Sequence, residues 1–147
     1  MLNYGKAKHF KEFWHKFEPI FDKKYDNLIN LNMDVIKQFM DILQIKTNTI
    51  FSSELDISSQ SSDRILEICK TLGADVYMSG ALGGNYLKLE DFKQNHIQVK
   101  FQNIHYPVFK QCFEPFMPNL STLDLLFNEG ENAIKIIKNA KVDWETT

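Results

Sequence analysis

This chain of 147 residues has no excess of basic residues, only two cysteines and no long apolar run. Each of these features excludes a class of protein. The 17 lysine and arginine residues face 19 aspartate and glutamate residues, so nucleic-acid binding is not expected. Two cysteines, Cys69 and Cys112, are too few for a disulfide framework and are expected to be free thiols. No apolar run approaches the roughly 20 residues that cross a bilayer, and the first residues do not resemble a secretory signal. A cytoplasmic protein without a membrane span is therefore predicted.

The residues that are present suffice for one folded domain over residues 1–147. Hydrophobic residues make up 44% of the chain and aromatic residues 13%, which is ample material for a core. Strand patterns alternate with helical ones, which indicates parallel strand-helix-strand units. The predicted fold is therefore α/β, with a small, mostly parallel β-sheet flanked by helices. Its strands are expected near residues 49–52, 75–79 and 97–101, which leaves both sheet edges unpaired.

Helical periodicity is strongest near the start of the chain. Five aromatic residues share one helical face and predict a core stripe: Phe10, Phe13, Trp14, Phe17 and Phe21. Proline disrupts a helix interior, so this helix is expected to stop or kink just before Pro19. Four capping signals predict further helices: Asp26 or Asn27 before a helix reaching about Leu43, Ser61 or Ser62 before one that ends at Gly73, Asn95 after a short helix over residues 90–94, and Ser121 before a helix to about Phe127. A last helix is expected over residues 133–137.

Three glycines within five residues follow the second predicted strand. Gly80, Gly83 and Gly84 lie where open α/β sheets place ligand-binding loops, because glycine lets backbone amides approach an anion closely. Their spacing matches neither the dinucleotide fingerprint nor the P-loop. The glycines therefore form either a binding loop, which we favour, or only a turn.

Nucleophile and acid-base candidates are few. Cys112 lies seven residues after His105, and a thiolate with an imidazole would supply a nucleophile and a base for acyl transfer. The alternative, which we favour, is a buried structural thiol beside Phe113. Glu54 follows the first predicted strand, at the end where sites gather in parallel sheets. No His, Cys and Asp cluster has metal-ligand spacing, so neither a metal nor a cofactor is predicted.

The segment from Ser121 to Gly130 contains helix-capping signals. Ser121 and Asp124 have the spacing of a capping box, in which each side chain satisfies the other residue's backbone amide. Asp124 is also a candidate catalytic carboxylate, but capping explains it fully and is favoured. Asn128 and Gly130 are expected to cap the other end of the same helix.

Several of these stretches together resemble one protein family. The resemblance rests on residues 107–111, on Phe113 and Phe116, and on residues 119–130. It is supported by residues 52–55, 69–75, 77–80 and 83–87, which follow in the same order. These motifs resemble the closing signature of the WbqC-like family and cover most of the chain.

The resemblance implies a role in bacterial surface-polysaccharide (O-antigen) biosynthesis. Family members are bacterial cytosolic proteins for which transfer of acyl or aminoacyl groups to sugars has been proposed. The implied function is a transferase acting on an amino sugar, carried by a nucleotide; the alternative is a non-catalytic sugar-nucleotide-binding or scaffold protein. Substrate binding is then expected from Ser53, Ser79, Gly80, Gly83, Gly84, Asn85, Tyr86 and Gln111.

The chain departs from the family pattern in two ways, and the first of them bears on its partners. Family members usually begin with a segment carrying a His, Pro and aromatic motif, and this chain is expected to start after it. Phe109 stands where the family usually has tyrosine, so that position lacks a hydroxyl. Loss of the opening segment would expose apolar surface. A homodimer or a complex with a separately encoded N-terminal half is therefore predicted, the alternative being a self-sufficient aromatic core.

Overall fold

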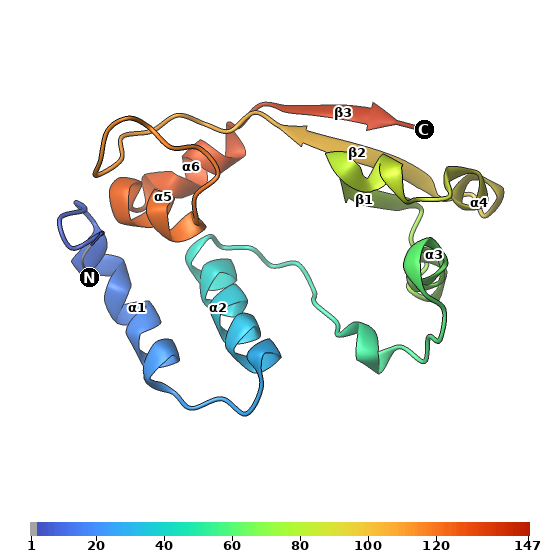
Figure 1. Ribbon diagram of the computed structural model, residues 1–147, viewed down its shortest axis with the longest axis horizontal. Helices are drawn as coiled ribbons and strands as arrows, with labels where there is room; N and C mark the ends of the chain where they lie inside the picture. Colours follow the sequence, from blue (N-terminus) through green and yellow to red (C-terminus); the bar gives the residue numbers. More distant parts are fainter. Residues whose placement is uncertain (1–2) are drawn as a thin grey trace. The chain divides into compact units, whose positions relative to one another are not determined.

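The computed structural model describes residues 3–147, which form a mixed α/β protein of two compact units (Figure 1). Unit 1 comprises the chain up to Thr47 together with Tyr106–Ala140. Unit 2 comprises Asn48–His105 and Lys141–Thr147. Each unit thus combines segments that are far apart in the sequence. The single domain expected over residues 1–147 stays a prediction.

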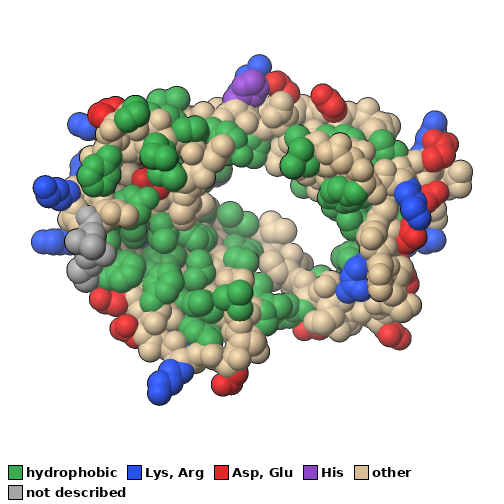
Figure 2. Space-filling view, in the orientation of Figure 1, with side chains coloured by type: hydrophobic (Ala, Val, Ile, Leu, Met, Phe, Trp, Pro, Cys, Tyr) green, Lys and Arg blue, Asp and Glu red, His purple; other side chains and the backbone are tan. Residues whose placement is uncertain are grey.

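Unit 1 is helical. It contains α1 (Phe10–Asp22), α2 (Leu28–Ile42), α5 (Thr122–Glu129) and α6 (Asn132–Lys138). The N-terminal aromatic stripe contributes Phe10, Phe13 and Phe17 to the core, where they pack with Leu125, Leu126, Phe127 and Ala133 of the later helices. Apolar side chains also remain at the surface around α1 and α2 (Figure 2), and Phe21 is 50% exposed. The stripe is therefore only partly a core stripe.

The helix break expected at Pro19 is wrong, because α1 continues through Pro19 to Asp22. A proline inside a helix leaves the carbonyl oxygen four residues earlier without its donor. Here that residue is His15, and both His15 and Pro19 are exposed. Water can therefore replace the missing hydrogen bond, which lowers the cost of continuing the helix.

Asn27 and Gly73 are two of the predicted helix caps that the structure confirms. The Asn27 side chain accepts a hydrogen bond from the backbone N–H of Asn30 at 3.1 Å and so opens α2. Gly73 follows α3 (Ser61–Thr71) with φ of +64°, the left-handed conformation that ends a helix. Capping is local in sequence, which explains why the sequence alone predicts it.

Unit 2 is built around a mixed sheet of three strands. The strands are β1 (Val76–Gly80), β2 (Gln98–Ile104) and β3 (Val142–Thr146), and β2 lies between the other two (Figure 1). β1 and β2 pair in parallel, with Tyr77 beside Val99, whereas β2 and β3 are antiparallel. The expectation of a mostly parallel sheet is therefore wrong.

The first predicted strand does not form. Residues 48–51 are irregular and lead into the 3-10 turn η1 (Ser52–Glu54). Ile50 and Phe51 are exposed. This segment therefore has no neighbouring strand against which its β-branched side chains could pack. Strand propensity reflects packing against neighbours more than an intrinsic preference, and without a neighbour this segment stays irregular.

One face of the sheet carries the core of unit 2. Phe92 from α4 (Leu89–Gln94) and Val99 from β2 are fully buried, and the rings of Tyr77 and Phe92 stack at 5.9 Å. Cys69 of α3 is buried in this core, and burial raises the pKa of its thiol. Cys69 is therefore an inert core residue, as its helical position predicts.

Gly83 is required by packing in this core. It lies in the 3-10 turn η2 (Ala81–Asn85), where a Cβ atom would lie 2.0 Å from the Ser79 hydroxyl and 3.0 Å from Phe101. Gly83→Ala is therefore expected to lower the free energy of unfolding by about 1–3 kcal/mol, measured by urea denaturation. Gly84→Ala is the matched control, because its Cβ would meet only Phe101 at 3.9 Å. Equal stability of the two variants would contradict this explanation.

No helix within residues 3–147 is both long and apolar enough to cross a membrane.

Candidate functional site

The predicted site residues divide between the two units. Unit 2 contains Ser53, Glu54, His105 and the stretch from Ser79 to Tyr86, whereas unit 1 contains Gln111, Cys112 and the segment from Ser121 to Gly130. Each group is therefore described within its own unit.

The glycine-rich loop of unit 2 follows β1 and forms the turn η2. Ser79 is buried, and its hydroxyl donates to the carbonyl of Gly80 at 3.2 Å. Gly80, Gly84, Asn85 and Tyr86 are exposed. Packing explains Gly83, whereas the exposed positions have room for a ligand. Substrate binding by this loop stays a prediction.

Glu54 and His105 engage in local contacts of unit 2. The Glu54 carboxylate accepts a hydrogen bond from the backbone N–H of Phe51 at 3.3 Å. His105 Nε2 lies 2.5 Å from Asp143 Oδ2, and this hydrogen bond, with Lys141 nearby, lowers the pKa of Asp143. Catalytic roles for these two residues stay predictions.

The most buried acidic group among the described residues is Asp124 of α5, which is 2% exposed. Its Oδ2 accepts a hydrogen bond from Gln111 Nε2 at 2.7 Å, and its Oδ1 accepts one from Asn128 Nδ2 at 3.1 Å. This geometry differs from the capping box that the spacing predicts. Ser121 does begin α5, since its hydroxyl accepts from the backbone N–H of Leu123 at 3.1 Å. The Asp124 carboxylate, however, takes two side-chain donors that lie farther away in the sequence.

Both donors to Asp124 are held in a fixed orientation. The Gln111 amide donates to the carbonyl of Met117 at 2.9 Å and accepts from its N–H at 2.8 Å. Asn128, expected beyond the helix, lies in its last turn, where its Nδ2 also donates to the carbonyl of Asp124 and its Oδ1 accepts from the Cys112 thiol at 3.4 Å. Neither amide can turn over without losing these bonds. Position 124 must therefore offer an acceptor on both sides, which aspartate does and asparagine does not.

The environment of Asp124 contains neutral donors. Burial raises the pKa of Tyr4, and the negative charge of Asp124 raises it further, so its phenol stays neutral at ordinary pH. Asp124 takes part in none of the ion pairs found among residues 3–147. A buried carboxylate without a cation is costly, so this one is suited to a cationic ligand.

A cavity of about 470 Å³ opens beside Asp124. We call it the carboxylate cavity; its lining consists of Asn3, Tyr4, Gln111, Cys112, Phe113, Glu114, Pro115, Met117, Leu120 and Asp124. It contains two acidic side chains and no basic one. The sequence predicts site roles for Gln111, Cys112 and Asp124 but not for the other lining residues, Asn3 and Tyr4 among them. No sequence signal links residues more than a hundred positions apart.

Metal ligation finds no support in the part of the chain that the structure describes. No three His, Cys, Asp or Glu side chains there are grouped so that they could hold an ion.

Comparison of the sequence with known proteins relates the chain to one family. The sequence model of the WbqC-like protein family matches residues 1–136. A Mycobacterium tuberculosis protein, Rv1507c, described as uncharacterized, is 31% identical over 134 residues, which are 90% of this chain and 58% of that protein. This chain thus spans little more than half the length of that relative. No solved structure matches the chain.

Proposed function

The chain belongs to the WbqC-like protein family, and from this premise we propose that it transfers an acyl or aminoacyl group to the amino group of a sugar. Its place would be bacterial surface-polysaccharide (O-antigen) biosynthesis in the cytoplasm. The observation that carries the proposal is the buried Asp124 carboxylate on the wall of a cavity without basic side chains. The amino group of an amino sugar supplies the positive charge that this carboxylate lacks.

The hydrogen-bonding capacity of Asp124 leaves room for such an amine. An ionised carboxylate has about four lone-pair sites, and Gln111 and Asn128 occupy two of them with neutral N–H donors. A charge-assisted hydrogen bond contributes about 1.5–3 kcal/mol. The same interaction discriminates an amine from a hydroxyl, because only the amine carries a charge.

Asp124 is also suited to the proton transfer that amide formation needs. An amino group held as an ammonium ion has no free electron pair, so one proton first passes to Asp124 and on to solvent. The amine nitrogen then attacks the carbonyl carbon of an acyl ester or thioester, so that a C–N bond forms and the C–O or C–S bond to the donor breaks. A second N–H proton passes through Asp124 to the leaving oxygen or sulfur, which yields an amide and an alcohol or thiol, with one proton released to solvent. The Cys112 thiol donates to Asn128 Oδ1, and this direct route does not require it as a nucleophile.

Two measurements on the unmodified protein test the proposal. Incubation with a nucleotide-linked amino sugar and an acyl or aminoacyl ester or thioester should increase the mass of the sugar by one acyl group. In calorimetric titrations, glucosamine should bind at least about tenfold more tightly than glucose, which corresponds to about 1.4 kcal/mol.

Variants test whether Asp124 causes the preference for glucosamine over glucose. Asp124→Asn should abolish it, whereas Asp143→Asn, which removes an exposed carboxylate of unit 2, should leave it unchanged. Binding of amino sugars without a mass change would instead favour the non-catalytic sugar-binding alternative. Equal affinity for glucosamine and glucose would contradict the role given to Asp124. Association with a second copy or with a separately encoded polypeptide stays a further prediction.

A further inference from the structure

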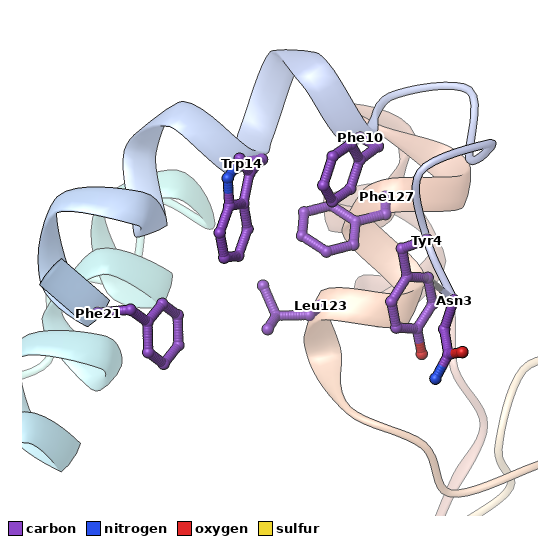
Figure 3. A pocket seen from close by; sticks show the side chains of 7 residues that line it. All are labelled: Asn3, Tyr4, Phe10, Trp14, Phe21, Leu123 and Phe127. Carbon is purple, nitrogen blue, oxygen red and sulfur yellow. The ribbon is translucent and has the colours of Figure 1, made fainter. Parts of the chain in front are cut away.

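A second cavity of unit 1 has a chemistry very different from that of the carboxylate cavity. It measures about 420 Å³ and is lined by the rings of Tyr4, Phe10, Trp14, Phe21 and Phe127 and by Leu123 (Figure 3). We call it the aromatic groove. In Figure 3, α1 supplies Phe10, Trp14 and Phe21, and α5 supplies Leu123 and Phe127.

The wall of the aromatic groove is organised before any ligand binds. The Phe10 and Trp14 rings stack at 5.7 Å with 12° between their planes, and the Trp14 and Phe21 rings stack at 5.9 Å with 9°. Phe10 also meets Phe127 edge to face at 5.1 Å, and both residues are buried. Phe21, by contrast, is half exposed. A rigid aromatic wall with an open end loses little entropy when it receives a ligand.

The lining of the groove favours an apolar occupant. It contains no charged side chain, and its polar groups are confined to Asn3, the Tyr4 hydroxyl and the Trp14 indole N–H. That N–H already donates to Glu18 Oε1 at 3.0 Å. A sugar or a phosphate placed here would leave most of its polar groups without partners. The methylene groups of an acyl chain form no hydrogen bonds, so they lose no hydrogen-bond partner when they enter the groove.

The two cavities are neighbours. Asn3 and Tyr4 line both of them, so the two cavities share a wall. We propose that the aromatic groove binds the apolar acyl group of the donor while Asp124 holds the accepting amine. This inference rests on the proposed function and adds to it the class of acyl group: an aliphatic or aromatic one without charge.

The product of such a transfer is an N-acylated amino sugar, which occupies both cavities. N-Acetyl-, N-butanoyl- and N-hexanoyl-glucosamine are therefore suitable probes for calorimetric titration. Each buried methylene should raise affinity about fourfold until the groove is filled. In Phe21→Ser and in Trp14→Ala this dependence on chain length should largely disappear, while the affinity for glucosamine itself stays the same. Phe21 is half exposed, so its replacement leaves the core intact even if the Trp14 variant fails to fold.

Trp144→Ala serves as the matched control. Trp144 is a comparably exposed aromatic residue of β3 in unit 2, and its replacement should leave the chain-length dependence unchanged. Equal affinity of the unmodified protein for all three probes, or a dependence that survives in the groove variants, would overturn the inference. The proposed function is tested separately in the same titrations by the preference for glucosamine over glucose.

Discussion

Asp124→Ala is expected to lower the free energy of unfolding by about 2–4 kcal/mol, because it leaves two part-buried N–H donors without an acceptor. Gln111 Nε2 and Asn128 Nδ2 both lose the carboxylate oxygen to which they donate. The Gln111 amide also holds the backbone of Met117, so the loop of residues 111–117 should loosen as well. Urea denaturation measures the first effect, and amide hydrogen exchange in this loop measures the second.

A control variant at an exposed carboxylate separates the effect of losing a buried hydrogen-bond network from the effect of losing a negative charge. Asp63 forms an exposed ion pair with Lys88 at 2.9 Å, and such pairs contribute at most about 1 kcal/mol. Asp63→Ala should therefore lower the free energy of unfolding much less than Asp124→Ala does. Asp124→Asn should fall between the two, since an asparagine accepts from only one of the two fixed amides. A free energy of unfolding for Asp124→Ala within about 0.5 kcal/mol of the original protein would exclude the network as a stabilising element.

The helices were largely predictable because their signals lie within a few residues. Asn27 and Gly73 mark helix ends through their own side chain or backbone conformation, and no distant contact is needed. Pro19 is the exception. Its effect depends on whether water reaches the carbonyl of His15, and burial is a property of the folded chain.

The sheet was predictable only in part, because a strand needs a partner. Residues 49–52 have β-branched character but pair with nothing, whereas Val142–Thr146, which follows the last predicted helix and was not predicted as a strand, forms β3. Val142 and Trp144 alternate there with charged residues, which is the period-2 signal of an exposed strand. Pairing of Gln102 with Trp144 across β2 and β3 is non-local, and it changes the sheet from parallel to mixed.

In the candidate site, too, the local contacts were predictable from the sequence and the non-local ones were not. Ser121 caps α5 through a neighbouring amide, and the sequence indicates this directly. The role of Asp124 depends instead on Gln111, 13 residues earlier, and on Tyr4 at the other end of the chain. A local capping pattern was therefore a sufficient explanation of Asp124 until the fold brought these partners together.

Gly130→Ala should be the most destabilising of the proposed substitutions. Gly130 ends α5 with φ of +58° and ψ of −134°, a conformation that is strained by about 1–3 kcal/mol for other residues. Its Cβ atom would also lie 2.6–2.8 Å from three ring atoms of His9. The ring cannot move away easily, because His9 Nδ1 bonds Glu12 at 2.8 Å and the His9 backbone N–H donates to Phe127. Overpacking adds about 1–3 kcal/mol, so a total decrease of about 2–6 kcal/mol in the free energy of unfolding is expected in thermal and urea denaturation.

Two further variants separate the conformational and steric parts of this loss. Gly73 has nearly the same φ, of +64°, but nothing lies within 4 Å of its Cβ position, so Gly73→Ala should cost only about 1–2 kcal/mol. In the double variant His9→Ala with Gly130→Ala, the steric part should disappear and leave the conformational part. A double variant as unstable as the sum of its single variants would show that the His9 ring does not require glycine at position 130. The segment would then need Gly130 for its backbone conformation alone, and the packing of α1 against the end of α5 would not depend on it.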